Sequence, residues 1–111
     1  MGVFNNLTAP LQCPHCGAST RVDVQFKYGN TWLLDYGLGE RLRWGGNDIG
    51  EPGKRHVVVD GAVATPCASC GHGEEWDAYV HVENDVLTLV ENADGRFDFA
   101  AAQTNYIVVS P

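Results

Sequence analysis

Two phrases of the sequence decide the fold, Cys13-Pro14-His15-Cys16-Gly17 and Cys67-Ala68-Ser69-Cys70-Gly71. Within each phrase, the C-x-x-C spacing lets one tight turn aim two sulfurs at the same ion, and the following glycine suits a left-handed backbone position. Two such turns, here called the first knuckle (residues 13–17) and the second knuckle (residues 67–71), supply the four soft ligands of tetrahedral zinc. Four thiolates close the shell and leave no position for water, so we expect a structural role for the ion. We therefore predict one structural Zn²⁺, held by Cys13, Cys16, Cys67 and Cys70.

Other uses of the cysteines stay open at this stage. Cys-Pro-His-Cys is also the active-site phrase of thiol oxidants with a thioredoxin-like fold, which need a buried strand before the motif and a long helix after it. Here residues 8–12 are a poor strand and residues 19–28 alternate like a strand. Two disulfides would require an oxidising compartment, and iron also binds Cys₄ sites. His15 and His72 could replace a thiolate, but we interpret both as solvent-facing residues beside a complete set of cysteines.

Alternating polar and apolar residues predict a mainly β protein, a single small antiparallel domain over residues 1–111. In the clearest case, Val22, Val24 and Phe26 alternate with polar residues. The dipeptide Asp60-Gly61 predicts a tight hairpin turn within residues 56–65, and Glu83-Asn84-Asp85 predicts a second reversal. No segment shows a long helical period. The predicted strands lie in residues 19–28, 56–65, 76–82, 86–90 and 106–109.

Knuckles beside β-hairpins resemble the zinc-ribbon family, and the resemblance covers the four cysteines and their flanking strands. It implies a zinc-ribbon type of fold and a metal-ligand role for these cysteines. Ribbons usually separate their knuckles by about 15–20 residues, whereas 50 residues separate Cys16 from Cys67 here. The excess predicts an inserted segment between the knuckles, which we place at residues 29–55. The opening Met1-Gly2-Val3-Phe4-Asn5 is similar to small uncharacterised bacterial and phage zinc-knuckle proteins.

The charge of the chain is −7 and lies in its last third. Residues 1–73 contain six acidic and six basic residues, whereas residues 74–111 contain eight acidic residues and only Arg96 as a base. Phosphate backbones are bound by Lys and Arg, so nucleic acid is an unlikely partner and a basic protein a better one. Without a long apolar run or a secretory leader, we expect a cytoplasmic protein that does not enter the membrane.

The 29–55 segment is rich in the residue types of binding surfaces. It holds two of the three tryptophans and four of the seven bases, and aromatic residues beside arginines often form binding hot spots. The same aromatic residues could instead pack over the sheet. Residues 45–55 do not form a phosphate-binding loop, because Asp48 and Arg55 stand where that motif needs Gly and Ser or Thr. Together with the acidic cluster after the second knuckle, the candidate partner-binding residues are Trp32, Tyr36, Arg41, Arg43, Trp44, Glu74, Glu75 and Asp77.

Three functions are compatible with these features. The first is a protein–protein interaction or inhibitor module that uses the aromatic segment and the acidic C-terminal third. The second is a small-molecule-binding protein or enzyme with a pocket under residues 29–55, although no catalytic motif is present and His56 and His81 fit packed or surface positions. The third is a nucleic-acid-binding ribbon that uses Arg41, Arg43, Lys54 and Arg55.

Overall fold

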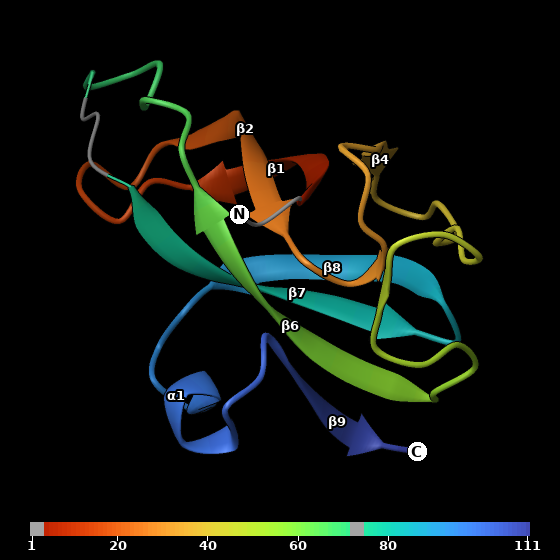
Figure 1. The fold of residues 1–111 in the computed structure, drawn as a ribbon. Coiled ribbons are helices and arrows are strands. Elements are labelled where there is room, and N and C mark those ends of the chain that lie inside the picture. Colours follow the sequence, from red (N-terminus) through yellow and green to blue (C-terminus); the bar gives the residue numbers. More distant parts are fainter. Residues whose placement is uncertain (1–3, 72–74) are drawn as a thin grey trace.

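The computed structural model describes residues 4–71 and 75–111, and they form one curled, mostly antiparallel β-sheet with a single short helix (Figure 1). This confirms the prediction of a mainly β protein. No helix in these two ranges is long and apolar enough to span a membrane. The elements are β1 (Asn5–Gln12), β2 (Ser19–Phe26), β3 (Gly29–Asn30), β4 (Asp35–Gly37), β5 (Asp48–Ile49), β6 (His56–Val63), β7 (Trp76–Glu83), β8 (Val86–Asn92), α1 (Phe99–Ala102) and β9 (Tyr106–Ser110).

The main sheet has the strand order β4-β1-β2-β6-β7-β8, and β9 pairs with β6. Only the β1–β4 pair is parallel among the pairs of this sheet. The sheet curls so far that its two sides approach each other, and the Asn92 side-chain amide donates to the Gln12 carbonyl oxygen at 2.7 Å. The inner face of this curl is the hydrophobic core.

Alternation along the strands builds the core, as predicted for residues 19–28. Val22, Val24 and Phe26 of β2 are buried, whereas Arg21 and Asp23 are exposed. The reversal between β7 and β8 is also confirmed. Asn84 and Asp85 both have positive φ angles, 52° and 66°, which is typical of a two-residue hairpin turn. The core residues are Leu7, Ala9, Leu11, Val22, Val24, Phe26, Tyr28, Tyr36, Leu42, Val57, Val59, Val63, Ala78, Val80, Val82, Leu87 and Val90.

The predicted hairpin at Asp60-Gly61 is wrong, because both residues lie inside the continuous strand β6. Gly61 is needed there for close packing, not for a turn. A Cβ atom at this position would come within 2.8 Å of Cγ1 of Val24 and 3.1 Å of the Ala78 carbonyl oxygen. β6 is paired on both sides at this point, with β2 and β7. The dipeptide is therefore a site of close strand approach, which is the other common reason for glycine in a strand.

Residues 8–12 are also a strand, against expectation, since they form the second half of β1. Leu7, Ala9 and Leu11 are buried, so the segment does alternate. Pro10 lowers the β-propensity of the stretch but fits an edge. The parallel partner β4 pairs with Asn6–Thr8, so within the described part of the chain no strand pairs with the far side of β1 at Pro10.

The 29–55 segment contributes one strand to the main sheet and packs against the core. It connects β2 to β6, which are adjacent antiparallel strands, and on the way it adds β4 beside β1 and the small β3–β5 pair. Tyr36 and Leu42 are buried in the core cluster. Trp44 packs edge-on against Tyr28, with ring centroids 5.4 Å apart.

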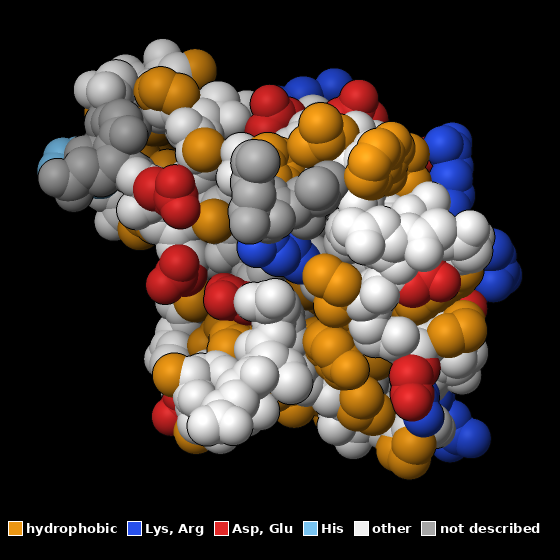
Figure 2. All heavy atoms as spheres, in the orientation of Figure 1, with side chains coloured by type: hydrophobic (Ala, Val, Ile, Leu, Met, Phe, Trp, Pro, Cys, Tyr) orange, Lys and Arg blue, Asp and Glu red, His pale blue; other side chains and the backbone are white. Residues whose placement is uncertain are grey.

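The surface of the molecule has a hollow between two lobes (Figure 2). One lobe carries the two knuckles, and the other carries α1 and the turn that precedes it (Figure 1). Acidic, hydrophobic and some basic side-chain atoms line this hollow on the face shown in Figure 2.

Candidate metal centre

The strand order brings the two knuckles to the same end of the sheet. The first knuckle joins β1 to β2, and the second joins β6 to β7. β2 and β6 pair antiparallel, with Val24 opposite Val63 and Phe26 opposite Gly61. The chain that leaves β6 at Val63 therefore runs on beside β2 towards the start of that strand, where the Asp23 N–H donates to the Thr65 hydroxyl at 2.9 Å. Although 50 residues separate the knuckles in sequence, they are neighbours in space because their two hairpins are neighbours in the sheet.

Each knuckle is closed by its own backbone in the same way. The Gly17 N–H donates to the Cys13 carbonyl oxygen at 2.8 Å, and the Gly71 N–H donates to the Cys67 carbonyl oxygen at 2.8 Å. Both glycines have left-handed backbones, with φ angles of 79° and 73°. This confirms the left-handed position expected from the CxxCG phrase, and an L side chain there would be strained.

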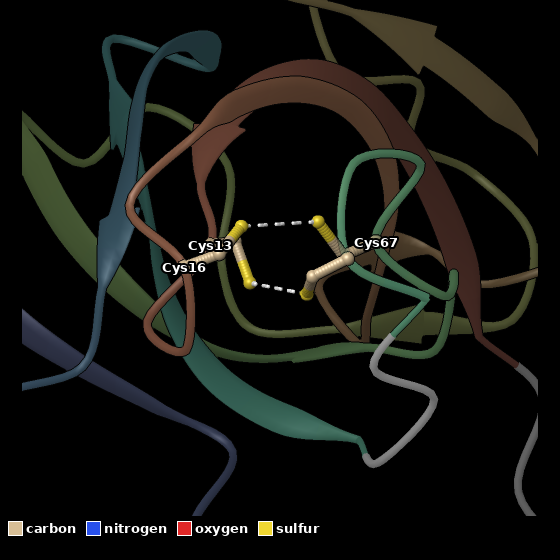
Figure 3. Close-up of side chains that lie close together, drawn as sticks. Cys13, Cys16 and Cys67 are labelled. Atoms are coloured by element: carbon tan, nitrogen blue, oxygen red, sulfur yellow. Dashed lines mark hydrogen bonds between the residues drawn. The ribbon is translucent and has the colours of Figure 1, made fainter.

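The four cysteine sulfurs converge at one point (Figure 3). All four Sγ atoms lie within 4.8 Å of one another. The Sγ atoms of Cys13 and Cys70 are 4.0 Å apart, and those of Cys16 and Cys67 are 3.6 Å apart. A tetrahedral ion with metal–sulfur bonds of about 2.3 Å requires sulfur–sulfur edges of about 3.8 Å. The two measured separations lie on either side of that value, so the sulfurs fit a tetrahedral metal ion.

The same distances do not fit disulfides. A disulfide needs about 2.05 Å between its sulfurs, and none of the four cysteines forms one. The thioredoxin-like alternative also fails, because β2 and not a helix follows the first knuckle. Among the described residues, the metal-binding group consists of the four sulfurs without His15; His72 lies outside the described residues. Metal binding with a structural role is thus the interpretation that the geometry supports.

The surroundings of Cys67 favour its thiolate form, which is the form that binds metals. Hydrogen bonds from the backbone N–H groups of Cys70 and Ser69 lower the pKa of Cys67 to about 6, with smaller contributions from the thiols of Cys16 and Cys70, while burial opposes the shift. The first cysteine of each knuckle is buried and the second is exposed. A bound ion would therefore lie at the boundary between core and solvent, where it would link the β1–β2 hairpin to the β6–β7 hairpin.

Comparison with known protein families, curated proteins and solved structures found no match to the chain. The likeness to zinc ribbons therefore rests on the two knuckles and their strands. The function has to be argued from the residues of this chain.

The remaining candidate residues are spread over the molecule. Trp32 is exposed, Tyr36 is buried and Trp44 is half-buried against the core, so the aromatic residues of the 29–55 segment divide between surface and packing. Arg41 and Arg43 are exposed, as are Glu75 and Asp77 near the start of β7. Glu74 lies outside the described residues.

One buried polar residue near the N-terminus was not singled out from the sequence. Asn5 is completely buried. Its side-chain amide donates to the carbonyl oxygens of Tyr28 (3.1 Å) and Asn30 (3.0 Å), and its carbonyl oxygen accepts from the N–H groups of Trp32 (3.2 Å) and Leu34 (3.1 Å). Asn5 therefore fixes the start of the 29–55 segment. An asparagine in a strand gives no distinguishing signal in sequence.

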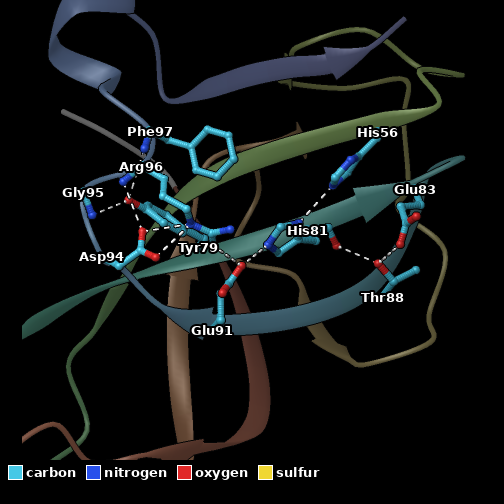
Figure 4. A network of polar contacts seen from close by, with 10 residues as sticks. All are labelled: His56, Tyr79, His81, Glu83, Thr88, Glu91, Asp94, Gly95, Arg96 and Phe97. Atoms are coloured by element: carbon cyan, nitrogen blue, oxygen red, sulfur yellow. Dashed lines mark hydrogen bonds and ion pairs between the residues drawn. The ribbon is translucent and has the colours of Figure 1, made fainter.

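A polar network on the outer face of the sheet was also missed (Figure 4). His56 Nε2 and His81 Nδ1 are 2.9 Å apart, and His81 Nε2 contacts Glu91 Oε2 at 2.5 Å. Arg96 pairs with Glu91 at 2.7 Å and with Asp94 at 2.8 Å. Burial opposes it, but hydrogen bonds from His81 and Arg96 hold the pKa of Glu91 below its usual value. The network holds the turn after β8 against the sheet, so both histidines have packing roles.

Proposed function

We propose that the protein is a zinc-stabilised β domain that binds another protein, and that Trp32 and Leu33 form its apolar anchor. The donor set supports zinc, because four thiolates in a closed tetrahedral arrangement are the usual shell of structural zinc. Zinc has no redox chemistry of its own, which suits an ion that only holds hairpins together.

The observation that carries the binding proposal is the exposure of two adjacent large apolar side chains, here called the 32–33 tip. Trp32 is 66% exposed and Leu33 is 64% exposed. Tryptophan is among the residues most enriched at binding hot spots. Two such residues side by side on a loop form a surface that gains free energy when a partner removes it from water.

The 32–33 tip is held in place by its backbone. Leu33 has a left-handed φ angle of 57°, which is costly for a leucine and is found mainly where the surroundings impose it. Here the Leu33 N–H donates to the Phe4 carbonyl oxygen at 3.0 Å, and the N–H groups on either side donate to buried Asn5. A fixed loop loses little conformational entropy on binding, so the tip is well suited to act as an anchor.

A basic protein is the partner that the charge favours. The net charge is −7, and eight of the fourteen acidic residues lie in residues 74–111. Complementary charge increases the rate of association with a basic partner. An inhibitor of a basic protein would be one form of this function. Nucleic acid stays a disfavoured partner. One of the four basic residues considered for that role, Lys54, already forms an ion pair with Glu51 at 3.0 Å.

We expect Trp32→Ala to weaken partner binding by about 30-fold or more, corresponding to about 2 kcal/mol for a hot-spot tryptophan. The measurement is a comparative capture at moderate salt with tagged wild-type and variant proteins, followed by titration of the protein recovered near stoichiometry. Leu89→Ala is the matched control, because Leu89 is also an exposed apolar residue but lies on β8. If both the Trp32→Ala and the Leu89→Ala variants bind the recovered partner with wild-type affinity, the 32–33 tip is not the anchor.

A further inference from the structure

Asp60 is an unusual residue for its place in the fold. It lies inside β6, which is paired on both sides, and opposite Tyr79 of β7. Aspartate is depleted in strands, and a half-buried carboxylate normally finds a hydrogen-bond donor. Within residues 4–71 and 75–111, no hydrogen bond or ion pair reaches the Asp60 carboxylate. Such a residue in a central strand indicates a role other than folding.

Three adjoining hollows meet at Asp60. The first has a volume of about 390 Å³ and is also lined by Asp77 and by the rings of Trp76, Tyr79, Phe97 and Phe99. The second, of about 280 Å³, continues from Asp60 towards the end of β2, and the third, of about 360 Å³, continues towards α1. We call the first the Asp60 hollow; its lining includes Pro14 of the first knuckle and Phe99 of α1, so it lies between the lobes that carry these two elements. None of the three is lined by a residue of the 29–55 segment.

The charges around Asp60 are mainly negative. Asp77 shares the first and second hollows with it, and Glu75 lines the second, where Lys27 is the one base among the lining residues. Lys27 forms no ion pair with any of these carboxylates within the described part of the chain. Burial and the negative charge of Asp77 raise the pKa of Asp60 above its usual value. Two carboxylates therefore repel each other beside aromatic walls, and a cation placed between them would relieve that repulsion.

The molecule already contains one guanidinium bound in this manner. Cζ of Arg96 lies 5.8 Å from the ring centroid of Tyr79 and 5.5 Å from that of Phe97. Its charge is compensated by Glu91 and Asp94, so it does not neutralise Asp60. The guanidinium plane stacks on aromatic rings and presents a fork of donors that matches carboxylates, which a compact ammonium group cannot do.

We propose that the Asp60 hollow binds a guanidinium group, with Asp60 and Asp77 as its charge partners and the aromatic walls as its stacking surface. The group would belong either to a small guanidine or to an arginine side chain of another protein. A volume of about 390 Å³ lies in the range of ligand sites. This proposal does not rest on the 32–33 tip, which is a separate feature of the surface.

Titration of ¹⁵N-labelled protein with argininamide tests the proposal. We expect resonances of Trp76, Asp77 and Asp60 to shift together with saturation, and Asp60→Asn and Asp77→Asn each to weaken binding about tenfold or more. Asp35→Asn is the matched control, because it removes one exposed acidic charge on β4, away from the three hollows. Citrullinamide, a neutral analogue of the same shape, should not bind. An Arg-containing tripeptide that binds more tightly than argininamide would assign the group to a protein partner, and the reverse would assign it to a small guanidine.

Three results would overturn the proposal. They are no shifts at up to about 20 mM argininamide, equal binding to Asp60→Asn, or equal binding of citrullinamide. The melting temperature provides a check that does not depend on any ligand. Folding raises the pKa of Asp60, so its ionised form destabilises the native state. The contribution of Asp60 to stability is therefore fully present only below its pKa of 3.8 in the unfolded chain, and it is lost as the pH rises through the folded pKa. Asp60→Asn should thus melt higher than wild type at pH 7, and the difference should shrink as the pH falls below 3.8, where Asp60 is protonated in both the folded and the unfolded state. A lower melting temperature at pH 7 would show that Asp60 has a structural role instead.

Discussion

Cys67→Ser is expected to abolish metal binding and to remove the cooperative thermal unfolding transition of the protein. The binding free energy of a structural zinc ion is itself folding free energy, about 10–16 kcal/mol in small zinc domains. Domains of this size are stable by only about 5–15 kcal/mol. An ion held by the four sulfurs would tie the β1–β2 hairpin to the β6–β7 hairpin, so its loss would affect both halves of the sheet. Circular dichroism melts together with zinc analysis of the purified variants measure the effect.

Two controls show whether the loss of stability in Cys67→Ser comes from the missing metal or from the serine side chain itself. Ser69→Ala changes an exposed side chain in the same knuckle but leaves its backbone N–H, so this variant should retain zinc and melt like wild type. A chelator should reduce the stability of the wild-type protein to that of Cys67→Ser and have no further effect on Cys67→Ser. A chelated, fully reduced wild-type protein with an unchanged melting temperature would show that no metal stabilises the fold.

Asn5→Ala should destabilise the protein by about 3 kcal/mol and loosen the 32–33 tip. The substitution leaves the N–H groups of Trp32 and Leu34 and the carbonyl oxygens of Tyr28 and Asn30 without their partner. Each buried polar group left unsatisfied costs about 1–3 kcal/mol, and water entering the cavity recovers part of this. Urea unfolding measures the loss of stability, and amide hydrogen exchange at Trp32 and Leu34 measures the loosening of the loop.

Asn6→Ala is the control for this prediction. Asn6 is the same residue type one position further along β1, but it is half-buried and its contact with the loop is through its backbone N–H, which donates to the Leu34 carbonyl oxygen at 2.8 Å. We expect a change within about 0.5 kcal/mol for this substitution. Equal stability of the two variants, with unchanged exchange at Trp32, would contradict the role that we assign to Asn5.

The features that could be predicted from the sequence are those with a short-range signal. The CxxCG spacing predicted the two knuckles and their left-handed glycines, because a single turn determines both. Alternation predicted β2, and the Asn84-Asp85 reversal followed from turn chemistry. Asp60-Gly61 was misinterpreted because the same glycine serves a tight turn or a close strand approach, and only the neighbours Val24 and Ala78 distinguish the two.

The features that could not be predicted depend on residues far apart in sequence. Asn5 contacts carbonyl and N–H groups 23 to 29 positions away, and nothing local marks it as different from Asn6. Asp60 and Asp77 come together because β6 pairs with β7, and their aromatic walls come from β7 itself and from the segment after β8 that leads into α1. The division of the 29–55 segment into core and surface likewise depends on how its loops pack against the curled sheet.

The most direct test of a zinc-stapled fold is X-ray absorption at the zinc edge on protein purified without added metal. The account predicts one zinc per chain, with a single shell of four sulfurs at about 2.3 Å and no change when His15 is replaced by alanine. Protein that is folded but free of metal, or a shell that contains nitrogen or oxygen, would contradict it.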